Sequence, residues 1–123
     1  PGGLPEPSLE ISTWLEMGDL NESLLEELDR LHPFGQGNRE PIFGLRDLVL
    51  EDSPDSFGDG NFRFRLPAQA GAKRGISGIA WQLGEPPKIG KAVDMAFRFS
   101  WNYWRNNRYP QLTLIDWRFS KDS

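Results

Sequence analysis

Cysteine is absent from this sequence of 123 residues, and histidine occurs once, as His32. The lack of cysteine excludes disulfide bonds and thiolate metal sites, and it is typical of the reducing cytoplasm, where we expect the protein to be located. No apolar run approaches the roughly 18 residues that a membrane helix requires, so we expect no membrane contact. Residues 1–4 contain neither an initiator methionine nor the start of a signal peptide, and we therefore expect the chain to be a piece of a longer polypeptide.

Side chains that carry out catalysis are also scarce. Metal-dependent hydrolysis needs several carboxylates or imidazoles around one or two ions, whereas His32 stands alone at the end of an expected helix, where it would cap the helix or face solvent. Asp52, Asp55 and Asp59 lie in a turn-rich segment, but their spacing fits no calcium-binding loop. We therefore predict no catalytic residue, no metal site and no cofactor in this chain.

Basic residues are rare in the first half of the chain. Residues 1–60 carry fourteen acids and three bases, a net charge of −11, whereas residues 61–123 carry four acids and eleven bases, a net charge of +7. The formal net charge of −4 therefore hides two different surfaces. A polyanion such as a nucleic acid is attracted by a positive field, so only the second half is expected to bind one.

An amphipathic helix is predicted over residues 21–31. Its polar side is acidic, Asn21 suits the N-cap, and Pro33 disfavours helical geometry in the residue before it. The apolar side, which we expect to pack against the rest of the fold, consists of Leu24, Leu25, Leu28 and Leu31.

Five later segments have the pattern of β-strands. In residues 62–66, apolar side chains alternate with Arg63 and Arg65, which places the rings inward and both guanidinium groups outward. Gly78 is expected to mark a bulge or a close backbone approach. The predicted strands cover residues 42–50, 62–66, 76–81, 93–101 and 111–119. We predict an all-β fold with a short N-terminal helix, in which the strands form a five-stranded antiparallel barrel of the OB type.

A resemblance to a known family lies in residues 33–43, which read Pro-Phe-Gly-Gln-Gly-Asn-Arg-Glu-Pro-Ile-Phe. This segment resembles the Pro-Phe-Gly-x-Gly-Asn-Pro-Glu-Pro-x-Phe sequence that opens the OB domain of RecJ-type exonucleases specific for single-stranded DNA. Residues 102–105, residues 111–112 and Asp116 resemble the family's Asn-x-Trp-Arg, Gln-Leu and Asp spacing. Arg39 replaces the usual proline, and Asn106 stands where glycine is common, although asparagine also tolerates the left-handed conformation.

The resemblance implies a DNA-binding part of a larger enzyme of DNA repair and recombination. Residues 1–34 would be an acidic linker and helix leading in from a catalytic region outside this chain, and residues 35–123 would be the OB-fold domain. The domain would grip single-stranded DNA and guide it to a catalytic domain that needs Mg or Mn. The full-length protein would then be a single-stranded-DNA exonuclease, a hydrolase, whereas this chain alone is not expected to be an enzyme. The expected partners are single-stranded DNA and the catalytic domains of the same polypeptide, and we expect a monomer.

Basic and aromatic residues of the second half are the candidates for binding DNA, because bases stack on rings while cations follow the phosphates. Trp101 and Trp117 are expected to be packed inside, and Trp14 is expected to dock on a neighbouring domain. For Trp81, burial and exposure both remain open. The predicted nucleic-acid-binding residues are Arg63, Arg65, Lys73, Arg74, Trp81, Tyr103, Trp104, Arg105, Arg108 and Tyr109.

Three other functions are alternatives to DNA binding. In a protein-interaction module, the acidic helix and the exposed aromatic residues would dock a partner, and binding would depend little on salt. Carbohydrate binding on the tryptophans would be equally indifferent to salt and to changes at Arg63 or Arg65. A complete small hydrolase has no catalytic constellation in its favour.

Overall fold

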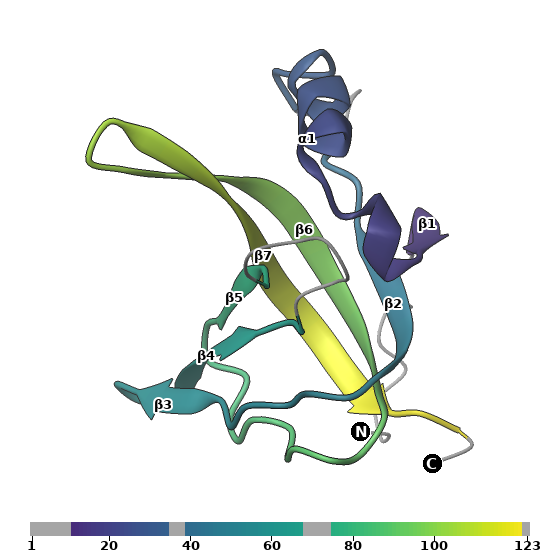
Figure 1. Cartoon of the computed structure of the whole chain (residues 1–123), viewed down its shortest axis with the longest axis vertical. Helices are drawn as coiled ribbons and strands as arrows, with labels where there is room; N and C mark the ends of the chain where they lie inside the picture. The colour runs from purple at the N-terminus through teal and green to yellow at the C-terminus, as the bar shows by residue number, and fades with distance from the viewer. Residues whose placement is uncertain (1–10, 35–38, 68–74, 122–123) are drawn as a thin grey trace.

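A computed structural model describes residues 11–34, 39–67 and 75–121 of the chain. One sheet, one short α-helix and one turn of 3-10 helix account for the regular structure of these residues (Figure 1). In chain order the elements are β1 (Thr13–Leu15), a 3-10 helix η1 (Met17–Asp19), α1 (Glu22–Asp29), β2 (Phe43–Leu48), β3 (Asp55–Phe57), β4 (Asn61–Arg65), β5 (Ser77–Ala80), β6 (Val93–Trp104) and β7 (Asn107–Phe119).

The sheet has seven strands in the order β1-β2-β6-β7-β5-β4-β3. It is mixed, because β1 pairs with β2 and β5 pairs with β7 in parallel, while the other neighbours are antiparallel. The predicted class, mostly β with a short N-terminal helix, is confirmed. The details differ from the predicted barrel: seven strands replace five, two pairs are parallel, and the sheet stays open, since β1 and β3 end it without pairing to each other.

Helix α1 begins where the sequence predicts. Asn21 is the N-cap, and its Oδ1 accepts a hydrogen bond from the backbone N–H of Leu24 at 3.0 Å. The helix ends at Asp29, earlier than predicted, because the next three backbone N–H groups bond to the carbonyl three residues back, which tightens the chain into a turn. Leu25 and Leu28 are buried as expected, whereas Leu31 lies beyond the helix and is 48% exposed.

One hydrophobic core joins the helix to the sheet. Its strand residues come from alternate positions, as the period of two in the sequence predicts. The main contributors from β4, β6, β7 and α1 are Phe62, Phe64, Phe97, Phe99, Leu112, Leu114, Leu25 and Leu28. Gly78 lies directly beneath the ring of Phe64, where any Cβ would collide with it. Gly78 therefore marks a close approach, but of the Phe64 side chain and not of backbone, and the β4–β5 register is regular there.

The long β6–β7 hairpin projects beyond the rest of the sheet (Figure 1). Among the described residues, β2 accompanies β6 only as far as Phe97, and β5 accompanies β7 only from Gln111 onward. The two residues of the turn, Arg105 and Asn106, have φ angles of 49° and 64°. Positive φ at both positions is the geometry of a type I′ turn, so the replacement of glycine by Asn106 keeps the turn, as predicted.

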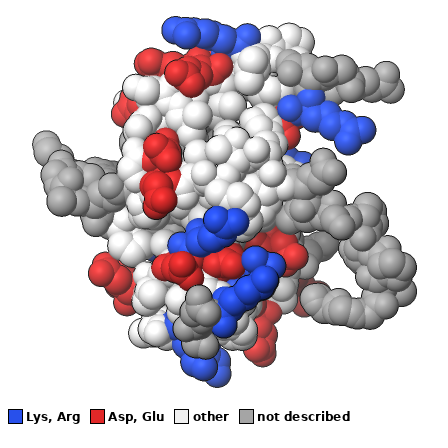
Figure 2. Space-filling model, turned by 90° about the vertical axis from the view of Figure 1, so that its right-hand side faces the viewer, with Lys and Arg blue, Asp and Glu red and all other residues white. Residues whose placement is uncertain are grey.

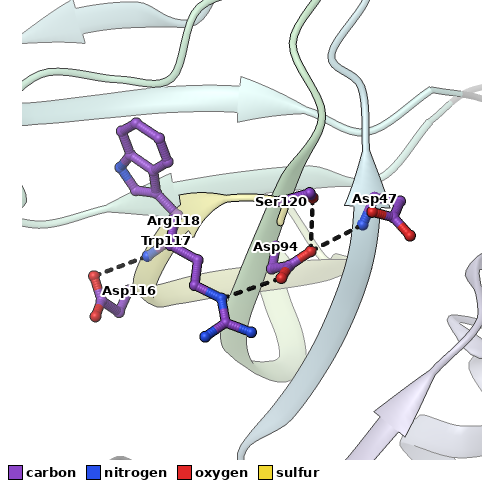
Figure 3. Close-up of polar contacts among 6 residues, drawn as sticks. All are labelled: Asp47, Asp94, Asp116, Trp117, Arg118 and Ser120. Carbon is purple, nitrogen blue, oxygen red and sulfur yellow. Dashed lines mark hydrogen bonds and ion pairs between the residues drawn. The ribbon is translucent and has the colours of Figure 1, made fainter. Parts of the chain in front are cut away.

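A buried carboxylate holds the opposite end of β6 in place (Figure 3). Asp94 Oδ1 accepts hydrogen bonds from the backbone N–H of Asp47 at 3.0 Å and from Ser120 Oγ at 2.8 Å, and Oδ2 accepts one from Arg118 Nε at 3.1 Å. Asp47 lies in the irregular part of β2, with a φ of 54°. Burial alone would raise the pKa of Asp94, but the three hydrogen bonds and the charge of Arg118 lower it below its usual value.

Candidate functional site

The side of the sheet that faces away from the core carries a row of polar side chains. Residues paired directly across neighbouring strands point to the same face. Arg65 pairs with Ser77, Ser77 with Gln111, and Gln111 with Ser100, so this row crosses β4, β5, β7 and β6. The Asn102–Tyr109 pair lies one step further along the hairpin on the same face. We call this side of the sheet the outer face.

A groove of about 450 Å³ lies on the outer face, over β4 and β5. We call it the outer groove. Its polar lining consists mainly of Asp52, Asp55, Arg63, Arg65, Asn102 and Gln111. The strand alternation of β4 places both arginines there, because Phe62 and Phe64 point into the core.

The two arginines of the outer groove are held differently. The guanidinium carbon of Arg63 lies 4.1 Å from the centroid of the Phe57 ring, a cation–π contact. Arg65 donates a hydrogen bond from Nη1 to the carbonyl oxygen of Gly75 at 3.0 Å. In the described parts of the chain neither arginine forms an ion pair. Both side chains are exposed, as predicted for residues that point away from the core. Both guanidinium groups keep N–H donors available for a ligand.

An aromatic pair stands at the β3 end of the outer groove. Phe57 meets Trp81 edge to face, with the ring centroids 5.7 Å apart. Trp81 is 55% exposed, which resolves the open choice between burial and exposure. Phe57 is a site residue that the sequence interpretation missed. The three residues of β3 are too few to show a strand period, so the sequence does not predict that the Phe57 side chain points to the outer face.

A second aromatic pair stands at the hairpin end. Trp104 and Tyr109 both belong to the outer face, because Trp104 follows Asn102 at the strand period and Tyr109 pairs with Asn102. Trp104 is 61% exposed and Tyr109 is 41% exposed, so neither ring is packed inside. The guanidinium carbon of Arg105 lies 5.3 Å from the Trp104 ring centroid. Aromatic rings therefore flank the cations of the outer groove at both ends.

Two predicted residues lie on the other face of the hairpin. Tyr103 pairs with Arg108 and shares the side of Trp101. The guanidinium carbon of Arg108 lies 4.0 Å from the Trp101 ring centroid, and Trp101 Nε1 donates to Asp29 Oδ2 of α1 at 3.2 Å. Tyr103 is 70% exposed. The predicted set is thus divided between the two faces of the hairpin.

The remaining predictions concern residues outside the described ranges and residues that are only partly exposed. Lys73 and Arg74 lie outside the described residues. Trp101 and Trp117 are partly buried against the core rather than fully inside it. Trp14 belongs to β1, where it lies under the guanidinium group of Arg46 at 3.8 Å from the ring centroid.

Two amide side chains are further groove residues that the site prediction omitted. Asn102 and Gln111 both line the outer groove, and the described part of the chain offers neither side chain a hydrogen-bond partner. Their donors and acceptors therefore face the groove unused. Both belong to the motif segments named above, which was the signal available in the sequence.

Charge is more mixed on the surface than along the chain. Asp55 of β3 lies directly across from Arg63 of β4, and Asp52 also lines the outer groove. Acids of the first half of the chain therefore lie beside bases of the second. The face on the side of β1 and β2 also shows acidic and basic groups intermingled (Figure 2). The two halves of the chain, with net charges of −11 and +7, therefore do not form two separate surfaces.

A metal ion does not fit the residues that the structure describes. Across residues 11–34, 39–67 and 75–121, no group of three or more His, Cys, Asp or Glu side chains is placed to hold one. Within the same ranges, no helix is both long and apolar enough to cross a membrane.

Comparisons with known proteins agree on one family. The family model described as "RecJ OB domain" matches residues 11–116. Two solved structures of RecJ from Thermus thermophilus are similar. The one in complex with Mn2+ is 26% identical, with a TM-score of 0.65, and the match covers 90% of this chain and 16% of that chain. The one in complex with Mg2+ is 27% identical, with a TM-score of 0.67, and the match covers 96% of this chain and 18% of that chain.

A search of curated proteins gives no significant match. The chain spans less than a fifth of the length of the two RecJ chains that it matches. The family model, in contrast, covers most of this chain, from β1 to near the end of β7. The protein described by this sequence therefore belongs to the RecJ OB domain family.

Proposed function

We propose that this domain binds single-stranded DNA in the outer groove. The observation that carries the proposal is the arrangement of exposed rings at both ends of a groove that holds two cations. Bases would stack on Trp81 at one end and on Trp104 and Tyr109 at the other, while Arg63 and Arg65 would contact the phosphates between them. Each stacked base contributes roughly 1 to 3 kcal/mol, and stacking needs bases that are not paired in a duplex.

The residues of the proposed site are expected to contribute unequally to the binding of DNA. Arg105 contributes a further cation beside Trp104. Asn102 and Gln111 would bind sugar, phosphate or base edges from the floor of the groove. Tyr103 and Arg108 are expected to contribute less, because they lie on the other face of the hairpin. Lys73 and Arg74 remain candidates.

In the whole protein the domain would guide the strand to a catalytic region. The related RecJ structures contain Mn2+ or Mg2+, so we infer that the metal chemistry belongs to that region and not to this chain. The full-length protein would be a cytoplasmic single-stranded-DNA exonuclease of DNA repair and recombination. We keep the division into an acidic lead-in, residues 1–34, and an OB-fold domain, residues 35–123, as well as the monomeric state, as predictions.

Titration of the purified domain with a fluorescent single-stranded oligonucleotide tests the proposal. If about three to five phosphates are neutralised, the logarithm of the affinity should fall with the logarithm of the salt concentration at a slope of roughly −2 to −4. The double substitution Arg63→Glu plus Arg65→Glu should abolish most of the binding without lowering the melting temperature, because both side chains are exposed.

A matched control keeps the same change in net charge. Lys88→Glu plus Lys91→Glu also reverses two exposed cations, but both lie in the loop before β6 and outside the outer groove. We expect this variant to retain most of its affinity. Equal losses of affinity in the two double variants would mean that binding depends on net charge and not on contacts in the outer groove. This result would contradict the proposal.

A protein-interaction role is the second candidate, and one observation favours it. A second groove, of about 450 Å³, lies between α1 and β6 and includes Asp29, Glu40, Trp101 and the exposed Tyr103. Its two carboxylates would repel a nucleic acid. If this surface were the functional one, binding to the oligonucleotide would be absent or nearly independent of salt.

A further inference from the structure

A separate depression lies on the outer face at the opposite end of β6 from the hairpin. Its volume is about 360 Å³. Trp14 of β1 forms one wall, Asp116 and Arg118 of β7 form the other, and Ala96 of β6 lies on the floor. The neighbours of β6, strands β2 and β7, are each about 4.8 Å away, and the Trp14 ring lies over Gly44 of β2, so the depression is roughly 10 Å wide.

The indole wall depends on the residues beneath and beside it. A Cβ on Gly44 would lie 2.7 Å from Trp14 Cε3, so the absence of a side chain lets the ring lie against β2. The guanidinium group of Arg46 covers the ring at 3.8 Å from its centroid. Trp14 remains 37% exposed. The ring is therefore fixed in position by β2 and Arg46, and the part of it that stays exposed borders the depression.

The opposite wall places an acceptor next to donors (Figure 3). Asp116 Oδ1 accepts the backbone N–H of Trp117 at 2.8 Å, which leaves Oδ2 available. Arg118 uses Nε for Asp94, and its two terminal nitrogens have no partner among the described residues. The two side chains are two positions apart on β7 and point to the same face (Figure 3).

The depression carries little net charge. Arg118 is paired with the buried Asp94, which leaves the single carboxylate of Asp116 as the uncompensated charge of the lining. A phosphate group or a metal ion gains little from such a site. A neutral planar group that packs beside the exposed part of the indole and both donates and accepts hydrogen bonds along one edge suits it well. Nucleobases have this chemistry.

We propose that this depression binds a nucleobase, and guanine in preference to the other bases. The Watson–Crick edge of guanine has N–H groups that donate to Asp116 and, beside them, an oxygen that accepts from Arg118. Adenine, cytosine and thymine each have only one N–H-bearing nitrogen on this edge for the carboxylate, whereas guanine has two. The base would contact the part of the Trp14 ring that Arg46 and β2 leave exposed.

This inference rests on the proposed function, because the base would belong to the strand held in the outer groove. Ala96 and Asn102 are six residues apart on β6, a distance of roughly 20 Å, and their alternate positions share the outer face. Arg98 lies between them on that face. A strand of about ten nucleotides, within the usual range for OB folds, would reach both places.

The test uses nuclear magnetic resonance of the whole chain, labelled with ¹⁵N and titrated with GMP, CMP or inorganic phosphate. The Trp14→Phe variant identifies the Trp14 indole N–H signal among those of the five tryptophans. We expect GMP to shift this signal in a saturable way, CMP to act at least about fivefold more weakly, and phosphate to have no saturable effect. Absence of a saturable shift with GMP, or an equal shift with phosphate, would overturn the inference.

Two variants separate this pocket from the outer groove. Asp116→Asn keeps an oxygen for the backbone N–H of Trp117 but loses the carboxylate, so GMP affinity should fall about fivefold or more while CMP affinity changes little. Arg63→Glu plus Arg65→Glu should leave the GMP shift unchanged although it removes oligonucleotide binding. If the wild-type domain shows the GMP shift without binding oligonucleotides, the proposed function fails and the base pocket stands. If Asp116→Asn leaves the preference for GMP intact, the base pocket is wrong.

Discussion

Asp94 joins three segments through one carboxylate, and its protonation should therefore change stability. Its pKa is lowered from the usual 3.8 in the folded protein. A lowered pKa means that the stabilising contribution is complete above the unfolded value and is lost as the pH falls through the folded value. The fold should therefore lose stability below about pH 4, in part because this carboxylate becomes protonated.

Asp94→Asn should lower the free energy of unfolding by about 1 to 3 kcal/mol at neutral pH, because at least one buried donor loses its acceptor. The difference from the wild type should shrink as the pH approaches 3, which denaturant titrations at several pH values would measure. Asp116→Asn is the matched control, since its carboxylate is exposed and the amide oxygen can replace Oδ1. Equal stability of Asp94→Asn and the wild type at pH 7 would contradict the structural role.

Phe57 has a positioning role, because its ring contacts two side chains of the proposed site. It contacts Arg63 through its face and Trp81 at its edge. Phe57→Leu should weaken oligonucleotide binding about two- to fivefold, the loss expected when an exposed cation–π contact disappears. Phe57→Tyr keeps the ring and should bind like the wild type in the titration with the fluorescent oligonucleotide. Full affinity of Phe57→Leu would show that neither group needs this support.

At the scale of the element, the hairpin of β6 and β7 determines which aromatic side chains share a face and can therefore contact the same ligand. Trp104→Ala should weaken strand binding by roughly 1 to 3 kcal/mol, the contribution of one stacked base. Because Trp104 is 61% exposed, the melting temperature should stay unchanged in the same sample.

Tyr103→Ala removes a ring of comparable exposure from the opposite face of the hairpin and serves as the comparison. We expect a smaller loss of affinity than for Trp104→Ala. A fall in melting temperature without a binding defect would instead place Trp104 in a structural role.

The elements that could be predicted are those with a long, regular period. Residues 93–101 alternate apolar and polar side chains, and β6 contains all of them. Strands β1 and β3 have three residues each, which is too short for a period to appear. The parallel pairing of β5 with β7 joins Ser77 to Gln111, and no local pattern encodes a contact between such distant positions.

The same limits apply to the candidate site. The alternation around Arg63 and Arg65 was enough to predict their exposure. The division of Tyr103 and Trp104 between two faces depends on the hairpin continuing past residue 101, where the predicted strand stopped. Phe57 enters the site only through the pairing of β3 with β4, which the sequence did not reveal.

At the scale of the whole molecule, the supply of metal ligands bears on whether this chain alone could hydrolyse DNA. We expect the purified chain, with magnesium or manganese added, to leave single-stranded DNA uncut, because its described residues hold no cluster of metal ligands. The assay would follow the release of nucleotides from an end-labelled oligonucleotide. Preparations of Arg63→Glu plus Arg65→Glu, purified identically, control for contaminating nucleases. Metal-dependent release by the wild type that the variant lacks would show that the chain is itself an enzyme.

In the described part of the chain, β1 and β3 end the open sheet without a further strand beside them, and their shortness affects how copies of the protein meet in concentrated solution. Each border strand, β1 and β3, is three residues long and offers few backbone groups to an incoming strand. Asp55 on β3 adds a charge that another copy would repeat and repel. Short edge strands that carry charged side chains protect proteins against edge-to-edge aggregation. The sheet can therefore stay unclosed without becoming a template for aggregation.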